Sequence, residues 1–327
     1  MPGRCKNCHV VYNIYCMNIL VTGGLGFIGS NYITQRRELG DNIINIDAET
    51  YAANHSNIIP MSTGKYTWIK GDINDASLVS SLLYQHDVDA VVNFAAESHV
   101  DNSIKNSGVF VRTNINGTHN LLECVKNSDK PNIRFVHVST DEVYGDLTET
   151  EPAFTEHSAI KPNSPYSASK AASDLLVRSY HVTHGMNTCI TRCSNNYGPN
   201  QHEEKLIPLM ISKALKGDNL PVYGDGRNIR DWIHVSDHCR AVSAVLERGK
   251  PGGVYNIGGE TEIRNIDLVM MILDQLSIPH THIKYVQDRQ GHDWRYAMNI
   301  DKIRNELGWE PQVNFKTGLY DLINHYR

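Results

Sequence analysis

Two acidic residues stand side by side where an apolar run ends, in "IRFVHVSTDEVYG". Carboxyl groups in such a place cost free energy unless they are solvated, paired or used. Adjacent residues within a strand face opposite sides, so we expect Asp141 and Glu142 to lie just past the strand end, where the chain turns. The pair is either catalytic or a solvated strand-end pair.

A second candidate pair is Tyr166 and Lys170, which are spaced to share one face of a helix. The stretch "NSPYSASKAASDLLVRSYHVTHG" predicts that helix. Its start and end signals are Asn163 or Ser164, Pro165 and Gly185. Its expected apolar stripe is Ala168, Ala171, Ala172, Leu175 and Leu176. Bringing a tyrosine pKa from about 10 to about 7 takes roughly 4 kcal/mol, to which a nearby ammonium group contributes. An exposed helical pair is the alternative interpretation.

Upstream, a glycine turn joins an apolar run to a helical pattern. "NILVTGG" predicts a strand, "FIGSNYITQRREL" a helix and "DNIINID" a second strand, which together make a βαβ unit. Gly23, Gly26 and Gly29 allow a tight turn and a close approach of the backbone to a pyrophosphate, and the helix N-terminus favours its charge. The unit predicts dinucleotide binding.

Asp47 ends the second strand of this unit. A carboxylate there accepts hydrogen bonds from ribose hydroxyls and repels a 2′-phosphate, which favours NAD over NADP. A solvated strand-end acid is the alternative. The next expected strand, "YTWIKGDI", ends at Asp72 and Ile73, which would flank the adenine. "DAVVNFAAES" ends in small residues where the cofactor should pass.

Strands and helices alternate through the first half, with one helix expected over residues 108–128. This alternation predicts an α/β fold with a doubly wound parallel sheet, in which ligands bind beyond the carboxyl ends of the strands. Four candidate residues fall at such ends: Ser98, Thr140, Asp141 and Glu142.

The composition excludes several classes of protein. The 327 residues carry a net charge of -5, which argues against a general nucleic-acid binder. No apolar run approaches the length of a membrane span. Seven scattered cysteines indicate reduced thiols in a cytoplasmic protein. Residues 1–16 are expected to be a disordered and dispensable leader, with Met17 as the natural start. Within them, "CKNC" has the spacing of half a zinc site, but no second pair of ligands follows at the required spacing, so we expect no metal.

Further motifs identify a family. "TGGLGFIG", "NFAAES", "VSTDEVYG", "YSASK" and "NNYGP" resemble the extended short-chain dehydrogenases/reductases, over residues 17 to about 325. The acidic pair, together with "AAESHVDNSI", "GPNQHEEKLIPL", "YGDGRNIRDWIHVSDH", "YNIGG" and "DRQGHDWRY", resembles the dTDP-glucose 4,6-dehydratases in particular. The resemblance implies a Rossmann-type domain, a smaller C-terminal substrate lobe, tightly bound NAD, and a homodimer formed through helices 108–128 and 166–184.

The resemblance also implies a reaction. Tyr166 takes the O4 proton of the glucosyl unit while hydride passes from C4 to NAD. Glu142 removes the C5 proton, Asp141 protonates the departing C6 hydroxyl, and Thr140 donates a hydrogen bond at O4. Hydride returns to C6, and the product is a 4-keto-6-deoxyglucose nucleotide. Lys170 completes the catalytic set.

Binding residues follow from the same motifs. The cofactor set comprises Gly23, Gly26, Phe27, Ile28, Gly29, Asp47, Asp72, Ile73, Ala95, Ala96, Ser98, Thr113, Tyr166, Lys170 and Asn196. The substrate set comprises Ser98, Thr140, Asn195, Lys205, Leu206, Pro221, Tyr223, Arg230, Asn256, Arg289 and His292. Within it, guanidinium forks at Arg230 and Arg289 suit phosphate oxygens, and Asn256 is a further diphosphate contact.

The expected domains are a cofactor domain of residues 17–192 and 228–255, and a nucleotide-sugar lobe of residues 193–227 and 256–327. Three alternative functions stay open. A UDP-glucose 4,6-dehydratase differs in the nucleoside, because thymine and uracil differ only by a methyl group worth about 1 kcal/mol of burial. A sugar-nucleotide 4-epimerase is disfavoured by the acidic pair. A non-catalytic NAD-binding regulator would make the intact catalytic set coincidental.

Overall fold

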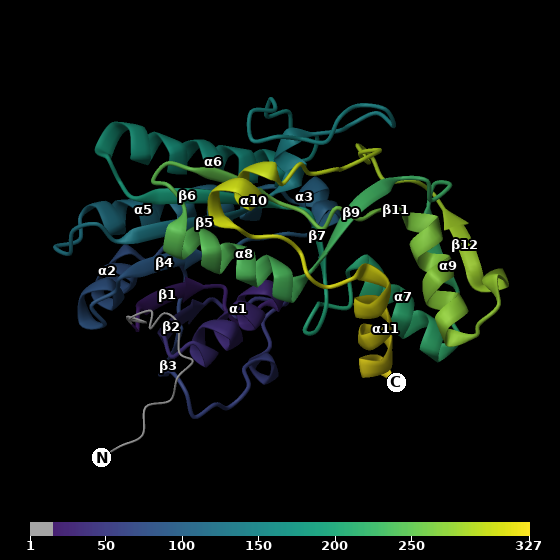
Figure 1. Cartoon of the computed structure of the whole chain (residues 1–327), viewed down its shortest axis with the longest axis horizontal. Coiled ribbons are helices and arrows are strands. Elements are labelled where there is room, and N and C mark those ends of the chain that lie inside the picture. Colours follow the sequence, from purple (N-terminus) through teal and green to yellow (C-terminus); the bar gives the residue numbers. More distant parts are fainter. Residues whose placement is uncertain (1–15) are drawn as a thin grey trace, which may run out of the picture.

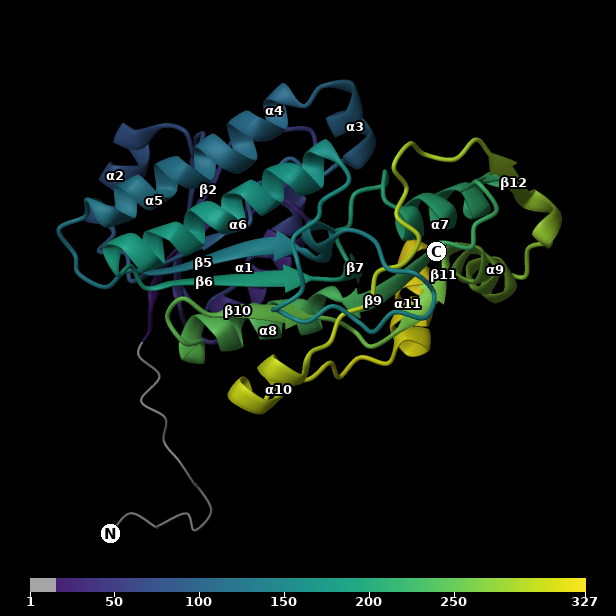
Figure 2. The same ribbon diagram turned by 90° about the horizontal axis from the view of Figure 1, so that it is seen from above.

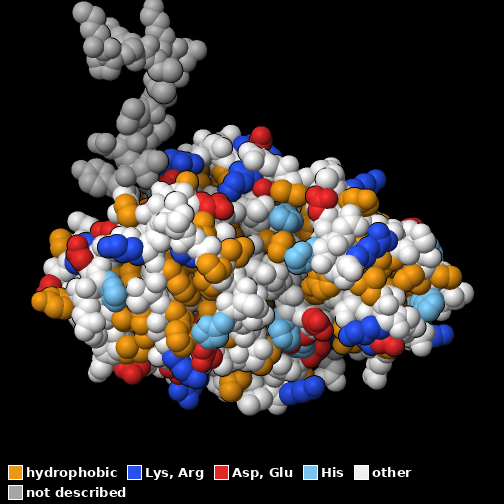
Figure 3. Space-filling view, turned by 90° about the horizontal axis from the view of Figure 1, so that it is seen from below, with side chains coloured by type: hydrophobic (Ala, Val, Ile, Leu, Met, Phe, Trp, Pro, Cys, Tyr) orange, Lys and Arg blue, Asp and Glu red, His pale blue; other side chains and the backbone are white. Residues whose placement is uncertain are grey.

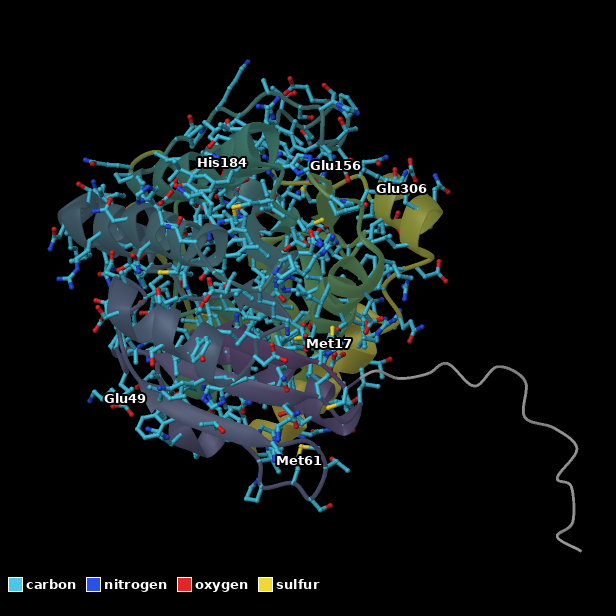
Figure 4. The ribbon with its side chains drawn as sticks, turned by 90° about the vertical axis from the view of Figure 1, so that its left-hand side faces the viewer. Met17, Glu49, Met61, Glu156, His184 and Glu306 are labelled. Atoms are coloured by element: carbon cyan, nitrogen blue, oxygen red, sulfur yellow. The ribbon has the colours of Figure 1, made fainter. Side chains whose placement is uncertain are left out.

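The computed structural model describes residues 16–327. The "CKNC" segment therefore lies outside the described residues, and the dispensability of the leader stays a prediction. Met17 immediately precedes the first strand. Figure 4 shows it on the side of the molecule away from Glu49, which lies on the loop after the second strand.

The central sheet consists of β1 (Asn18–Thr22), β2 (Asn42–Asp47), β3 (Tyr66–Lys70), β4 (Ala90–Asn93), β5 (Arg134–Thr140), β6 (Thr188–Cys193) and β10 (Val254–Ile257). Their order is β10-β6-β5-β4-β1-β2-β3. Every pairing in this sheet is parallel. This arrangement confirms the predicted Rossmann-type fold, in which the strand order reverses between β1 and β4.

Helices cover both faces of the sheet (Figure 1). One face packs against α1 (Phe27–Glu38), α8 (Val235–Arg248) and α10 (Asp301–Leu307), and the other against α2 (Ala76–Gln85), α5 (Thr118–Lys126) and α6 (Pro165–His184). The short helices α3 (Val100–Lys105) and α4 (Gly108–Phe110) lie near the N-terminal half of α6. Each face buries its own hydrophobic core.

The long helix α6 begins and ends as predicted. Ser164 caps it, and a reciprocal pair of hydrogen bonds with Ser167 forms a capping box. Pro165 occupies the first turn, and Gly185 ends the helix in the left-handed conformation. These signals place Tyr166 in the first turn, directly over the sheet.

The buried face of α6 differs from the expected apolar stripe. Ala168 and Leu175 are exposed, whereas Lys170, Ser173 and Asp174 are buried. The helix turns a polar face to the sheet, and these polar groups find partners there. Its apolar residues Ala168 and Leu175 face outward instead.

The helix expected over residues 108–128 is interrupted. It begins as α4, continues through a π-helical stretch, Val111–Gly117, and ends as α5. Within the π-helical stretch, Asn114 accepts a hydrogen bond from the Glu97 backbone N–H at 2.9 Å and donates to the Ser169 Oγ at 2.8 Å. The stretch therefore anchors α6 to the segment that follows β4.

A smaller lobe lies at one end of the molecule (Figures 1 and 2). It contains β7 (Asn195–Tyr197), β9 (Ile229–His234) and β11 (Glu262–Arg264) in one sheet, β8 (Leu220–Tyr223) and β12 (Ile283–Val286) in another, and α7 (Leu206–Lys216), α9 (Asn265–Leu276) and α11 (Phe315–Tyr326). These elements share a separate core that includes Trp232, Leu268 and Phe315.

The packing does not follow the expected division at residue 255. Strand β10 spans that residue and pairs with β6 through Ile257 and Cys193. Ile303 of α10 and Trp309 pack in the core that contains α8. The chain therefore returns to the cofactor domain twice after the small lobe begins. A further cluster, which includes Tyr144 and Tyr296, joins loops of the two parts.

The surface is mixed in character. Figure 3 shows charges of both signs interspersed with hydrophobic side chains on one face. Among residues 16–327, each helix is too short or too polar to traverse a lipid bilayer.

Candidate active site

One cavity of about 520 Å³ opens beyond the carboxyl ends of β1, β4 and β5. It gathers all the predicted cofactor and catalytic residues and four of the predicted substrate residues, Ser98, Thr140, Asn195 and Lys205. They are Gly23, Gly26, Phe27, Ile28, Gly29, Asp47, Asp72, Ile73, Ala95, Ala96, Ser98, Thr113, Thr140, Asp141, Glu142, Tyr166, Lys170, Asn195, Asn196 and Lys205. Residues from distant parts of the chain thus meet where a parallel sheet places its ligands.

The glycine turn is sterically required. Gly23 has a φ of +68°, and a Cβ there would lie 2.8 Å from the Ala95 Cα. A Cβ on Gly29 would lie 2.5 Å from the Gly23 carbonyl oxygen. Larger residues would push α1 away from β1, so the turn keeps the N-terminus of α1 at the cavity wall.

Asp47 braces this turn. Its Oδ2 accepts a hydrogen bond from the Leu25 N–H at 2.9 Å, and its Oδ1 accepts one from the Glu49 N–H at 2.8 Å. Each carboxylate oxygen has a second lone pair, so the side chain can still accept bonds from a ligand's hydroxyls. The carboxylate is therefore held in position by the loops that form the wall.

The far end of the cavity is formed by Asp72 and Ile73, which follow β3. The strand itself ends at Lys70, earlier than the expected end at Asp72 and Ile73. Asp72 forms an ion pair at 2.9 Å with Arg112 of the π-helical stretch, a cavity residue that the sequence analysis missed. No motif singled out Arg112.

Thr140, Asp141 and Glu142 follow the geometry expected of them. Strand β5 ends at Thr140, and a 3₁₀ turn begins at Asp141. The Thr140 hydroxyl donates to Asp141 Oδ1 at 3.1 Å and accepts from the Glu142 N–H at 3.3 Å. The turn brings both carboxyl groups to the cavity instead of placing them on opposite faces of a strand.

The two acids have different surroundings. Burial and the neighbouring Glu142 raise the pKa of Asp141 well above its usual value, and its Oδ2 lacks a partner among the described residues. Burial also raises the pKa of Glu142, but the charges of Lys205 and Arg230 oppose that shift. The arrangement therefore favours a protonated Asp141 beside an ionised Glu142.

Tyr166 and Lys170 project from successive turns of α6. Burial and then Glu142 raise the pKa of Tyr166 well above 10. Lys170 donates to the Val138 carbonyl oxygen at 2.8 Å, and burial lowers its pKa to about 8. The lysine is thus fixed on the sheet, and the protein's own groups do not provide the expected lowering of the tyrosine pKa.

Asn196 is held in place by a hydrogen bond with α8. Its Oδ1 lies 2.9 Å from Nδ1 of buried His238, and its Nδ2 donates to the Ser194 carbonyl oxygen at 3.0 Å. Because the amide nitrogen is already a donor, the histidine must donate from Nδ1. Neighbouring Asn195 also lines the cavity, and its Oδ1 lacks a partner among the described residues.

Lys205 closes one side of the cavity. Its ammonium donates to the Ser98 carbonyl oxygen at 3.0 Å, and burial lowers its pKa. Glu97 and Glu204, not predicted as site residues, also line the cavity, where burial and Glu204 raise the pKa of Glu97. Glu204 was discoverable only through the motif "GPNQHEEKLIPL", because its residue type alone carries no signal.

The expected phosphate-binding arginines lie outside the residues that line the cavity. Arg230 is buried, donates to the Ile229 carbonyl at 2.7 Å and the Asp293 carbonyl at 2.9 Å, and stacks over Tyr296 at 4.4 Å. Arg289 forms a 2.6 Å ion pair with Asp101. Both guanidinium groups are therefore engaged by the protein.

Other predicted substrate residues form a wall in the small lobe. Tyr223 of β8 packs against Arg289, whose guanidinium carbon lies 5.3 Å from the ring centroid, and against His292 at 6.3 Å. His292 Nδ1 lies 2.7 Å from Asp288. Pro221 lies on β8 and Leu206 begins α7, both outside the cavity lining.

The prediction that Asn256 contacts a diphosphate is wrong. Asn256 is completely buried in β10. Its Oδ1 accepts from the Tyr144 hydroxyl at 2.7 Å, and its Nδ2 donates to the Phe154 carbonyl at 2.9 Å. Both ends of the amide are hydrogen-bonded in the protein interior, and no part of the side chain reaches a surface where a ligand could contact it.

Asn265, at the start of α9, is the better candidate for that contact. Its side-chain Oδ1 is buried and lacks a partner among residues 16–327. Its backbone N–H donates to the Asn228 carbonyl oxygen at 3.0 Å, which holds the beginning of α9 against the segment that leads into Arg230. No motif singled out Asn265.

Comparison with known proteins identifies the family. The sequence model described as GDP-mannose 4,6 dehydratase matches residues 20–322. A dTDP-glucose 4,6-dehydratase of Xanthomonas campestris pv. campestris (strain B100) is 49% identical, with 94% of this chain and 92% of the relative covered. One from Haemophilus influenzae is 50% identical, with 95% and 98% covered.

A solved structure gives the same result. The crystal structure of DesIV, a dTDP-glucose 4,6-dehydratase from Streptomyces venezuelae with NAD and TYD bound, has a TM-score of 0.91 and 47% identity, covering 95% of this chain and 97% of that chain. The similarity in sequence and in structure extends across both lobes. The chain therefore belongs to the dTDP-glucose 4,6-dehydratase family.

Proposed function

We propose that the protein converts dTDP-glucose to dTDP-4-keto-6-deoxyglucose and water. The observation that carries this proposal is the pair of carboxyl groups with unlike surroundings, Asp141 and Glu142, in one cavity with Tyr166. An epimerase needs only the removal and return of hydrogen at C4. A dehydratase also needs an acid and a base to eliminate water across C5 and C6.

The cavity fits NAD. The close approach of Gly23 and Gly29 leaves room for a pyrophosphate at the α1 N-terminus, and Asp47 offers acceptors to ribose hydroxyls while disfavouring a 2′-phosphate. Lys170 and Asn196 line the part of the cavity nearest the catalytic acids. When bound, NAD would accept hydride from the sugar C4 and return it to C6.

The chain's own residues move the protons. Tyr166 takes the O4 proton, and Lys170, one helical turn away, is the cation of this chain that helps the phenol to ionise. Glu142 removes the C5 proton and later returns it. Asp141 protonates the C6 hydroxyl, which leaves as water, and the proton taken from O4 restores Asp141 over the cycle. All atoms of the substrate are accounted for.

The nucleotide portion binds at the small-lobe wall that contains Tyr223, Arg289 and His292. Arg230 and Arg289 supply positive charge, Tyr223 offers an aromatic surface, and Asn265 at the α9 N-terminus offers an amide. Anions are favoured at a helix N-terminus. The thymidine assignment follows the relatives from Xanthomonas campestris and Haemophilus influenzae, which are dTDP-glucose 4,6-dehydratases.

The test uses purified protein and substrate deuterated at C4, offered as dTDP-glucose and, separately, as UDP-glucose. We expect the dTDP substrate to lose one water and the deuterium to appear at C6. Deuterium retained at C4 with an inverted configuration would instead identify an epimerase. Faster turnover of UDP-glucose would keep the reaction and change the nucleoside.

We also propose a homodimer formed through α5 and α6. Apolar side chains are exposed on this side of the molecule, namely Val109, Val111, Leu175 and Val182. Figure 2 shows α5 and α6 running side by side there. Replacing Leu175 with Glu should shift the mass measured by light scattering from dimer to monomer, whereas the same change at exposed Tyr320 should not.

A further inference from the structure

A buried charge cluster lies beneath the catalytic helix. Tyr166, Lys170 and Asp174 follow one another at single-turn spacing on the buried face of α6. Asp174 is 1% exposed, and its Oδ2 accepts from Arg192 Nε of β6 at 2.8 Å. The Tyr144 hydroxyl accepts from Arg192 Nη1 at 2.9 Å. The reaction described above uses neither Asp174 nor Arg192.

His137 of β5 lies beside both Lys170 and Asp174, and its ring is uncharged. Its Nε2 lies 3.5 Å from Lys170 Nζ and 3.7 Å from Asp174 Oδ1. Burial, together with the charges of Lys170 and Arg192, lowers its pKa well below 6.5, so the ring is neutral.

Hydrogen bonds assign the tautomer of His137. The Thr22 hydroxyl accepts from the Ala95 N–H and donates to Asn93 Oδ1 at 2.7 Å, so Asn93 Nδ2 faces His137 Nδ1 at 3.2 Å. The ring proton is then on Nε2, directed at Ser173 Oγ at 3.1 Å. His137 therefore offers Lys170 no lone pair.

The remaining neighbours of Lys170 are neutral or cationic. Burial raises the pKa of the Cys193 thiol on β6 to about 12, and the pKa of Asp141 in the turn after β5 is also raised well above its usual value. Tyr166 on α6 is a phenol, because its pKa is raised well above 10. Burial raises the pKa of Asp174 too, but the charge and hydrogen bond of Arg192 oppose that shift and favour the ionised carboxylate. Among the described residues, Asp174 is therefore the anion left to balance the lysine.

We propose that Asp174, held by Arg192, is the buried counter-ion of Lys170 and positions its ammonium group beside Tyr166. The inference rests on the proposed roles of Lys170 and Tyr166. Arg192 competes with Lys170 for the same carboxylate, so it limits how much of the negative charge the lysine experiences. Asp174 and Arg192 are thus positioning residues that act through Lys170.

The pair predicts pH shifts of opposite sign. Asp174→Asn keeps the shape and removes the anion, so the Lys170 pKa, about 8, should fall. Activity that needs the ammonium should then be lost at a lower pH. The alkaline limb of the kcat/KM-against-pH profile, where activity falls as Lys170 loses its proton, should move down by about one pH unit. Arg192→Gln frees the carboxylate for Lys170 and should move the limb up. Arg192→Lys keeps the charge and should leave the limb in place.

The experiment measures kcat/KM against pH for the wild type and these three variants. It also measures the Kd of NAD against pH on cofactor-depleted protein, by quenching of intrinsic fluorescence. We expect the alkaline loss of NAD affinity to move in the same direction as the limb of kcat/KM. Limbs of Asp174→Asn and Arg192→Gln that coincide with the wild-type limb would overturn the proposal.

Two safeguards keep this test decisive. Thermal unfolding shows whether Asp174→Asn folds. If it does not, the double variant Asp174→Asn/Arg192→Met removes both charges, and the pH at which its NAD affinity is lost must differ from that of Arg192→Lys. If the wild type shows no dehydratase activity, the proposed function fails, whereas the pH dependence of NAD binding still decides the role of Asp174.

Discussion

The cofactor-side wall of the cavity, with Asp47, Thr140 and Asp141, differs from the small-lobe wall of Tyr223, Arg289 and His292 in how its polar side chains are engaged. On the cofactor side, Asp47 and Thr140 are held by neighbouring groups but keep acceptors available, and Oδ2 of Asp141 has no partner within residues 16–327. On the nucleotide-sugar side, Arg289 is already paired with Asp101, and His292 with Asp288. One wall is ready for its ligand, and the other must exchange protein contacts for ligand contacts.

The kind of partner matters on the second wall. Arg230 is held by carbonyl oxygens, which fix its position without neutralising its charge. Arg289 is held by a carboxylate, which does neutralise it and which an incoming phosphate must displace. We therefore expect Arg230 to contribute a fixed positive field and Arg289 to exchange its partner when the nucleotide binds.

The sharpest separation of the two walls comes from Glu142→Gln. The amide cannot act as a base, so we expect kcat to fall by about 10²–10⁴-fold. Affinities for NAD and dTDP should not weaken, because Glu142 places negative charge near Lys205 and Arg230 and so does not attract the nucleotide. Product formation and equilibrium binding measure the two effects.

Glu149→Gln is the matched control, because that side chain is 64% exposed and lies outside the residues that line the cavity. It should leave both kcat and binding unchanged. A Glu142→Gln variant that loses dTDP affinity in proportion to kcat would show that the walls are not separate.

Much of the cofactor wall could be predicted from the sequence, and the reason is local. A glycine turn, a strand-end acid and a Tyr-x-x-x-Lys pair each depend on neighbours only a few residues away, and parallel strands bring their ends together. Asp141 and Glu142 are expected past the strand end because successive side chains of a strand point to opposite faces, so two adjacent acids within the strand could not both face the cavity. The structure confirms that geometry.

The second wall was harder because its contacts join distant segments. Asn256 was assigned from a motif, but its burial depends on β10 pairing with β6, which no local pattern reveals. Periodicity also misjudged α6, because buried Ser173 and Asp174 find partners on β5 and β6. A hydrophobic pattern locates a buried face only where that face is apolar.

Arg289→Met tests the exchange directly. Hydrogen bonds to charged groups contribute about 1.5–3 kcal/mol, so we expect the Kd of dTDP to rise by about 10–100-fold. The Kd of NAD should not change, because Arg289 lies outside the cofactor cavity. Calorimetry with each ligand checks both statements. Arg248→Met, at an exposed position of α8, should change neither, and an equal loss of NAD affinity in Arg289→Met would contradict the separation of the walls.

The smallest expected effect comes from releasing Arg289. Asp101→Asn removes the carboxylate that competes with the phosphate, and a partly exposed ion pair is worth little, so dTDP affinity should increase by only about 2–5-fold. The gain should shrink as salt screens the pair in the wild type. Asp301→Asn, which removes a comparable partner from Arg304 on α10, should leave dTDP binding unchanged. If Asp101→Asn instead weakens dTDP binding, Asp101 orients Arg289 for the phosphate, and the second wall would be as ready for its ligand as the first.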